Sequence, residues 1–305
     1  MGILRSIYNL MPNKMKNFAL HELEEYGQKK YAQKVKENAL NLRKTILEYY
    51  ADKEISDIKI KKAVEYLRVN QTDFYTKRIM SDSNLKVKYG FDNERKLPYV
   101  MHYGKKLYFK RDMSIKSMIA AYKALLNEQN VDSPHLYLRA EDKTKKYCCV
   151  VDAGASEGIF SLDIIDYCDK LYIVECDSSW NEALRATFSP YRFKVIFCNK
   201  YLGDKMNSEV ISLDELLKEE KKVDLIKMDI EGAEPSALMG GESVLAQNDQ
   251  CRLLVCVYHY QNEEKDVDSI LNNYKKDYRD SYVIFPHDYD QQIPYFRNGV
   301  ITYFK

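Results

Sequence analysis

Residues 148–162 read CCVVDAGASEGIFSL, and this stretch decides the fold of the chain. An apolar run ends at Asp152, Gly154 and Gly158 follow four residues apart, and a second apolar run begins at Ile159. This pattern predicts a buried strand, a tight turn and a helix. Glycine lets the backbone approach a ligand closely, and the start of the helix offers free N–H groups. The stretch therefore predicts a loop that binds a nucleotide-like ligand.

Short apolar runs recur from this stretch to the end of the chain. There are seven, at residues 147–152, 170–175, 193–198, 223–229, 252–259, 282–286 and 299–304. The first five are separated by segments long enough for crossover helices, which is typical of a doubly wound α/β sheet. The last two are joined by HDYDQQIPYFRN, which has no helical period. We therefore expect these two to pair antiparallel and close the sheet edge, in a mostly parallel seven-stranded sheet.

The chain upstream of residue 147 has a different pattern. Residues 1–85 are polar with a rough helical stripe, and they predict a helical N-terminal extension that could form a homodimer contact. Residues 86–146 predict a β-hairpin within LPYVMHYGKKLYFKR (97–111) and then a helix, leading into the core. We expect this middle region to cap the acceptor side of the site. Residues 147–305 form the α/β domain.

Composition limits the partners and the compartment. The 47 basic and 46 acidic residues give a net charge of +1, so no strong field favours nucleic acid as a partner. No apolar run is as long as a membrane span, and the start has no secretory signal. The seven cysteines are odd in number and lack metal-binding spacings, which argues against disulfides and a zinc site. These features predict a cytoplasmic protein.

The features of the loop permit either NAD or S-adenosylmethionine. Glu175 ends the second apolar run, where an acidic residue accepts hydrogen bonds from both ribose hydroxyls. The dinucleotide fingerprint G-x-G-x-x-G would require glycines where Ser156 and Ile159 stand. A pyrophosphate needs that bare backbone, whereas the methionyl end of a methyl donor needs a sharp bend and a nearby anion. Asp152 is placed to face its amino group. Taken alone, the loop leaves both ligands open, as well as a purely structural turn.

A second motif follows the fourth apolar run. VDLIKMDIEGAEPSALMGGESVL (223–245) brings Asp229, Glu231 and Glu234 close together in sequence. Ligands of doubly wound sheets bind outside the carboxyl ends of the strands, so these acids would stand beside the reactive end of the ligand. Three close carboxylates disfavour one another's ionised forms unless a cation is near. A sulfonium, Lys227 or a divalent metal held by these oxygens could provide it. Alternatively, the acids only satisfy a helix N-terminus.

These motifs carry a family resemblance. VVDAGASEGIFSL, LYIVECD, ISLDELL and VDLIKMDIEGAE, in this order and spacing, resemble the FkbM family of S-adenosylmethionine-dependent methyltransferases. LLVCVYH, which ends at His259, is similar to that family too. The resemblance covers about residues 147–305 and implies a class I, Rossmann-like methyltransferase domain with seven strands, the last antiparallel.

The resemblance also implies a set of site residues. The donor would be held by Asp152, Gly154, Ser156, Gly158, Glu175 and Glu231, with Glu175 on the ribose and Asn199 or Lys200 at the adenine. Ser156 stands where many relatives have Asn. Asp229, Glu231, Glu234 and His259 match positions that line the active side. A metal at Asp229, Glu231 and Glu234 is a secondary possibility, and the main expectation is no metal.

The activity implied by the resemblance is O-methylation, with a carbohydrate or glycan hydroxyl as acceptor. A hydroxyl is a weak nucleophile, so a base must take its proton. His259 titrates in the right range and Asp229 is the alternative, while His135 in DSPHLY could also reach the cleft. Two rivals remain: a non-catalytic glycan-binding or assembly module on the same fold, and a NAD-dependent oxidoreductase. The complete set of Asp152, Glu175 and Asp229 speaks against a dead site.

Overall fold

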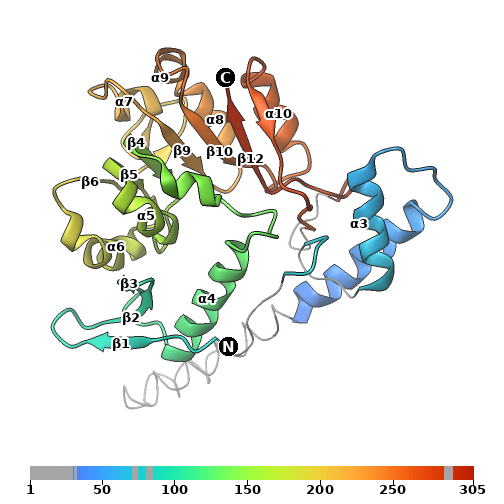
Figure 1. Cartoon of the computed structure of the whole chain (residues 1–305), viewed down its shortest axis with the longest axis horizontal. Helices are drawn as coiled ribbons and strands as arrows, with labels where there is room; N and C mark the ends of the chain where they lie inside the picture. The colour runs from blue at the N-terminus through green and yellow to red at the C-terminus, as the bar shows by residue number, and fades with distance from the viewer. Residues whose placement is uncertain (1–29, 31–32, 71–74, 80–84, 285–290) are drawn as a thin grey trace, which may run out of the picture.

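The computed structural model describes residues 30, 33–70, 75–79, 85–284 and 291–305. Its centre is a seven-stranded sheet in the order β11-β12-β10-β9-β4-β5-β6 (Figure 1). The strands are β4 (Tyr147–Ala153), β5 (Cys168–Val174), β6 (Val195–Cys198), β9 (Leu225–Met228), β10 (Arg252–Cys256), β11 (Lys275–Asp277) and β12 (Val300–Phe304). β12 is antiparallel to both neighbours, and the other pairs are parallel. The predicted α/β class, with its mostly parallel sheet and antiparallel last strand, is confirmed.

The strand that pairs with β12 at the edge differs from the predicted one. The sequence predicts it at residues 282–286, but β11 occupies Lys275–Asp277. Val283 instead makes isolated bridges with Tyr75 and Arg297. β11 reads KKD and buries none of its residues fully, so hydrophobic periodicity cannot reveal it. Residues 285–286 of the predicted run lie outside the described residues.

Helices cover both faces of the sheet. One face packs against α4 (Ile115–Glu128), α5 (Ile159–Ile164) and α6 (Asn181–Thr187). The other packs against α7 (Leu213–Leu216), α8 (Glu234–Met239), α9 (Glu242–Gln247) and α10 (Glu263–Ile270). Successive side chains of a strand point to opposite faces, so Val150 joins the first core and Val151 the second. A strand buried on both faces reads as a continuous apolar run, which is why β4 was visible in the sequence.

A small antiparallel sheet and α4 lie beside the large sheet (Figure 1). It consists of β1 (Tyr89–Asp92), β2 (Leu97–His102) and β3 (Lys105–Tyr108). β2 and β3 form the hairpin expected around Gly104, whereas β1 was not predicted. The sheet packs on α6 through Leu97 and Tyr108. α4 begins after Ser114, whose hydroxyl accepts a hydrogen bond from the amide of Ser117.

Two N-terminal helices, over residues 33–49 and in α3 (Ile58–Val69), form a separate cluster. They stand to one side of the sheet in Figure 1. The buried side chains of this N-terminal region pack against three side chains from the C-terminal part of the chain, Tyr282, Ile284 and Phe296. The N-terminal members of the cluster are Leu42, Ile46, Tyr50, Ala63, Val64 and Leu67. Of the expected N-terminal extension, residues 1–29, 31–32, 71–74 and 80–84 lie outside the described residues. Among the described helices, none has the length and apolar character needed to cross a membrane.

The remaining elements are short. A two-stranded parallel sheet joins β7 (Tyr201–Leu202) to β8 (Val210–Ile211). The 3₁₀ turns are η1 (Ala140–Thr144), η2 (Ile165–Tyr167), η3 (Ser178–Trp180) and η4 (Ser189–Tyr191).

Candidate active site

The strand order reverses between β4 and β9, because β5 and β6 lie on one side of this pair and β10 on the other. Ligands of doubly wound sheets bind outside the carboxyl ends of the strands at this point. A cavity of about 670 Å³ opens there, within the range of about 300–1,000 Å³ typical of small-molecule sites. The α/β domain contributes, among others, Gly154, Ser156, Glu157, Glu175, Lys200, Lys227, Asp229, Glu231 and Tyr258. Segments outside the sheet contribute Tyr75, Leu125, Glu128, Gln129, His135, Tyr137 and Val283.

The glycine loop packs directly against the end of β9. Gly154 has a φ of 74°, and a Cβ atom there would lie 1.8 Å from the carbonyl oxygen of Asp229. Only glycine fits this backbone and this approach. Gly158, with a φ of 89°, precedes α5, and a Cβ there would meet Leu184 and Phe188 at 2.9 Å. Gly154 lines the cavity. Gly158 does not, and its lack of a side chain lets the loop pack closely against Leu184 and Phe188.

Glu175 lies at the end of β5 and fits a ribose diol. One carboxylate oxygen accepts the amide of Ser156 at 2.7 Å, and the other accepts the amide of Asp177 at 2.7 Å. Each oxygen of a carboxylate can accept two hydrogen bonds, so both keep capacity for a ligand hydroxyl. Ser156 supplies its amide from a left-handed conformation, with a φ of 49°. The loop and the carboxylate thus hold each other in place on the cavity wall.

Asp152 lies beneath the loop and does not line the cavity. It is fully buried, accepts a hydrogen bond from the Ser161 hydroxyl at 2.6 Å and lies 3.0 Å from Nζ of Lys227. The same ammonium group donates to the carbonyl oxygens of Gly154 at 2.6 Å and Ala153 at 3.2 Å. Burial lowers the pKa of Lys227, but the charges of Asp152 and Asp229 outweigh it and raise the pKa. This placement gives no support to the predicted contact of Asp152 with a donor amino group.

Asp229 lies at the centre of a hydrogen-bond network at the end of β9. Its carboxylate accepts the hydroxyl of Tyr137 at 2.5 Å and that of Tyr258 at 3.5 Å, and it meets Nε2 of His259 at 3.1 Å and of His135 at 3.4 Å. Burial alone would raise the pKa of Asp229. The hydrogen bonds from both histidines and the charge of Lys227 outweigh burial and hold the pKa well below its usual range. Asp229 is therefore an ionised group.

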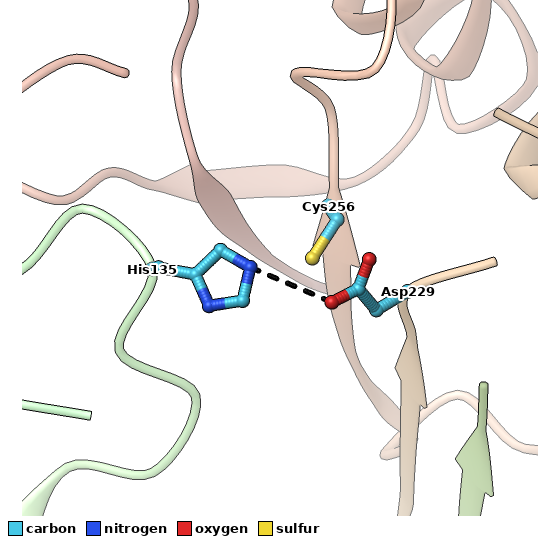
Figure 2. Close-up of side chains that lie close together, drawn as sticks. All are labelled: His135, Asp229 and Cys256. Carbon is cyan, nitrogen blue, oxygen red and sulfur yellow. Dashed lines mark ion pairs between the residues drawn. The ribbon is translucent and has the colours of Figure 1, made fainter. Parts of the chain in front are cut away.

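His135 reaches the cavity from the segment that precedes β4, as the sequence suggested. Figure 2 shows its ring beside Asp229 and Cys256, with the ion pair to Asp229 dashed. Nε2 also lies 2.9 Å from the hydroxyl of Tyr258. His135 is 7% exposed, and its Nδ1 is a buried nitrogen with no hydrogen-bond partner among the described residues. Burial raises the pKa of the Cys256 thiol well above its usual range, so this group stays protonated.

His259 lies behind Asp229 and does not line the cavity. Its Nδ1 lies 3.2 Å from Glu263 and 3.5 Å from Glu234, opposite the contact of Nε2 with Asp229. Burial lowers the pKa of His259, but the hydrogen bonds to Asp229 and Glu263 raise it to about 11. An imidazolium with both nitrogens donating has no lone pair for a proton. The geometry therefore argues against the predicted role of His259 as a general base.

The three acids of the second motif are not brought together as one metal-binding set. Glu234 accepts the amides of Ile230 at 2.7 Å and Gly232 at 2.8 Å, which fixes the turn after β9. Glu231 is exposed at the cavity. Among the described residues, ligand atoms lie within 4.8 Å of one another in two sets, one of Asp229, Glu234 and His259 and one of His135, Asp229 and Cys256. Burial raises the pKa of Glu234 to about 8. Glu234 is engaged by two amides, and His259 lies between Asp229 on one side and Glu234 and Glu263 on the other, so these side chains satisfy one another without an ion.

Asn199 and Lys200 follow β6 and differ in position. The Asn199 amide donates to the backbone carbonyls of Glu175 at 2.5 Å and Cys176 at 3.2 Å, so it fixes the end of β5 and does not line the cavity. Lys200 lines the cavity, near Trp180 and Tyr201. These aromatic rings provide a surface for a planar base.

Several cavity residues were missed in the sequence. Tyr137 and Glu128 lie upstream of the recognised motifs, and no local pattern marks them. Tyr258 directly precedes His259, and Glu157 stands within the glycine loop, so both carried a positional signal. Burial raises the pKa of Glu128, and it raises that of Glu157 to about 7.

A family model and several solved structures are similar to this chain. Residues 133–280 match the family model described as the methyltransferase FkbM domain. No curated protein matches the chain. Methyltransferase FkbM from Methylobacillus flagellatus KT is 18% identical, with 61% of this chain and 54% of that chain covered and a TM-score of 0.42. The chain thus spans about half the length of that protein.

Two other solved structures share less of the sequence. Precorrin-6y C5,15-methyltransferase from Geobacter metallireducens GS-15 is 12% identical, with 54% of this chain and 87% of that chain covered and a TM-score of 0.36. An rRNA methylase from Streptococcus thermophilus is also 12% identical, with coverages of 53% and 88% and a TM-score of 0.36.

Proposed function

We propose that this chain, which belongs to the FkbM methyltransferase family through residues 133–280, methylates a hydroxyl of a carbohydrate or glycan with S-adenosylmethionine as donor. The observation that carries the proposal is Glu175 on the cavity wall, with hydrogen-bonding capacity left on both oxygens, beside the loop at Gly154. A carboxylate beside a glycine loop, at the point where the strand order reverses, suits a ribose. Among the groups of the site, Glu175 is the one that best fits this role.

The donor would occupy the half of the cavity formed by the α/β domain. Glu175 would accept the ribose hydroxyls, and the loop from Gly154 to Ser156 would follow the bend of the methionyl arm. Trp180, Lys200 and Tyr201 would surround the adenine. When bound, the donor supplies an electrophilic methyl group on a sulfonium. The missing glycines of the dinucleotide fingerprint count against NAD in the same place.

The acceptor would enter beside residues from outside the sheet. This half of the cavity is formed in part by α4 and the segment before β4, which supports the role of residues 86–146 as an acceptor-side cap. Tyr75, Tyr137 and Tyr258 present rings with polar tips, while Glu128 and Gln129 add hydrogen-bonding groups. Such a lining suits a neutral acceptor with several hydroxyls.

The acceptor's proton would pass to His135, which Asp229 positions. Asp229 is ionised and can only accept hydrogen bonds, so the Nε2 of His135 that faces it carries the proton. Nδ1 then holds a lone pair, and because this nitrogen is buried, the acceptor must displace neighbouring side chains to reach it. Asp229 would also stabilise the imidazolium that forms. His135 thus replaces His259 as the proposed base, and Asp229 keeps a role as the positioning group.

A methyl-transfer screen tests the proposal. Radiolabelled S-adenosylmethionine would be offered with nucleotide sugars and cell-envelope glycans, with and without EDTA. We expect label on a hydroxyl oxygen, unaffected by EDTA, because the side chains around Asp229 satisfy one another without an ion. His135→Gln should lower kcat by about 10²–10⁴-fold. Label on nitrogen or carbon, or NADH binding without methyl transfer, would contradict the proposal.

Two features outside the site are part of the same proposal. All seven cysteines are free, which supports a reducing compartment such as the cytoplasm.

Ile58 and Val69 are exposed on α3, which supports a homodimer through the N-terminal helices. Light scattering of the purified protein would test the second inference, and a monomer at micromolar concentration would contradict it.

A further inference from the structure

The donor of the proposed function carries a methionyl ammonium group, and the site must supply an anion for it. Asp152, the predicted anion, is buried beneath the loop and paired with Lys227. We propose that Glu157 is the residue that binds this ammonium group. The inference rests on the proposed function, because it concerns the same donor in the same cavity.

Glu157 has the position that this role requires. It lies in the glycine loop between Ser156 and Gly158, it is one of the residues that line the cavity, and it is 6% exposed. Among the described residues, the groups that act on its carboxyl are its own amide, the amide of Ile159, the ammonium of Lys227 and the carboxyl of Glu128. The ammonium of Lys227 is already engaged by Asp152 and two loop carbonyls. Glu157 therefore faces the cavity without a cation of its own.

The other acids of the cavity are engaged in other contacts or belong to other elements of the chain. Glu175 braces Ser156 and Asp177, and Asp229 accepts from Tyr137 and meets both histidines. Asp177 pairs with Lys110 at 3.0 Å and caps η3. Glu231 is exposed, and Glu128 belongs to α4 on the acceptor side. Glu157 is the acid that the donor loop itself presents to the cavity.

The environment of Glu157 gives the contact a pH dependence. Burial raises the pKa of Glu157 to about 7, although the nearby amides and Lys227 lower it. A bound ammonium group favours the ionised carboxylate. The affinity for a ligand with the ammonium group should therefore fall as pH decreases below about 7. A ligand without it should show no such dependence.

Two probes separate this contact from the rest of the donor site. S-adenosylhomocysteine has the amino-acid arm, whereas 5′-methylthioadenosine has the same adenosine and thioether without it. Isothermal titration would measure both dissociation constants from pH 6 to 8 for the wild type, Glu157→Gln and Glu128→Gln. Glu128→Gln is the matched control, because Glu128 lines the same cavity and its pKa is also raised by burial.

We expect Glu157→Gln to weaken S-adenosylhomocysteine binding about ten- to hundredfold at pH 8, as for loss of a charged hydrogen bond, and to leave 5′-methylthioadenosine binding unchanged. The wild type should bind S-adenosylhomocysteine more tightly at pH 8 than at pH 6, and Glu157→Gln should lose this difference. Unchanged S-adenosylhomocysteine binding in Glu157→Gln, or the same loss in Glu128→Gln, would overturn the assignment.

The remaining outcomes are also decisive. If Glu157→Gln binds neither probe because it fails to fold, the wild-type pH profile decides, and a ratio of the two affinities that is constant from pH 6 to 8 overturns the assignment. If the wild type binds neither probe, the proposed function itself fails. Binding of both probes without a role for Glu157 leaves the proposed function standing and removes only this inference.

Discussion

His259 is a structural cation behind the site. Its ring is held between Asp229 on one side and Glu263 and Glu234 on the other. Removing one partner of a buried ion pair leaves an uncompensated charge and typically costs about 3–5 kcal/mol. The charge of Asp229, which also pairs with His135, is thus balanced by a second histidine that does not line the cavity.

His259→Gln should lower the free energy of unfolding by about 3–5 kcal/mol at pH 7. The folded pKa of about 11 lies above the usual histidine value of about 6.5, so the stabilisation is complete below that value and is lost as pH rises toward 11. Urea unfolding between pH 6 and 10 should therefore show a steeper loss of stability in the wild type than in the variant. Parallel pH curves for the two proteins would contradict this assignment.

The pair of Asp152 and Lys227 should behave as one unit. Lys227→Met and Asp152→Asn each leave a buried charge unpaired, so each should destabilise the protein by about 3–5 kcal/mol. The double variant removes both charges and should be more stable than the sum of the single effects predicts. A urea-unfolding cycle measures the coupling. Additive effects would show that the ion pair contributes nothing beyond its separate contacts.

The sequence predicted which strand ends carry the site, but not the direction of each side chain. Gly154, Glu175 and Asp229 all reach the cavity as expected. Asp152 does not, because β4 and β9 pair in a register that sets it opposite Lys227. That register joins residues about 75 positions apart, so no local pattern contains it. The same holds for His259, whose carboxylate partners Glu234 and Glu263 begin α8 and α10.

The loop between β4 and α5 can be tested through its glycines. Gly154→Ala would force a Cβ atom toward the Asp229 carbonyl, 1.8 Å away, in a backbone with a φ of 74°. We expect loss of donor binding and a destabilisation of about 2–3 kcal/mol beyond the backbone strain. Gly104→Ala is the control, because its φ is 87° but nothing lies within 4 Å. It should cost about 1–2 kcal/mol and leave S-adenosylhomocysteine binding intact.

The edge strand β11 and the docking of α4 are two features of the elements that the sequence did not predict. The five parallel strands of the α/β domain are apolar runs, four of them mostly buried, and the sequence pattern predicts all five. β11 is a short edge strand, and an apolar run nearby drew the prediction to residues 282–286 instead. The sequence predicted only that residues 86–146 cap the acceptor side, and not that α4 lines the cavity. Its helical period was clear, but the docking of Met118 and Tyr122, which brings Glu128 to the site, is a tertiary property.

The molecule combines an α/β domain with elements from both ends of the described chain. The N-terminal helices pack on Tyr282, Ile284 and Phe296, while Tyr75 and Val283 line the cavity. Leu67→Ala should destabilise this cluster by about 2–5 kcal/mol, because Leu67 is fully buried in it. S-adenosylhomocysteine affinity should stay unchanged in the folded variant, since the donor half belongs to the α/β domain. A parallel loss of affinity would show that the cluster shapes the donor half as well.

The central claim is that the cavity at the ends of β4, β5 and β9 binds a methyl donor. Isothermal titration of the wild type and of Glu175→Ala with S-adenosylmethionine tests it most directly. The account predicts one site per chain in the wild type and at least about tenfold weaker binding in Glu175→Ala, since the ribose would lose charged hydrogen bonds. No binding by the wild type, or equal affinity in Glu175→Ala, would contradict it.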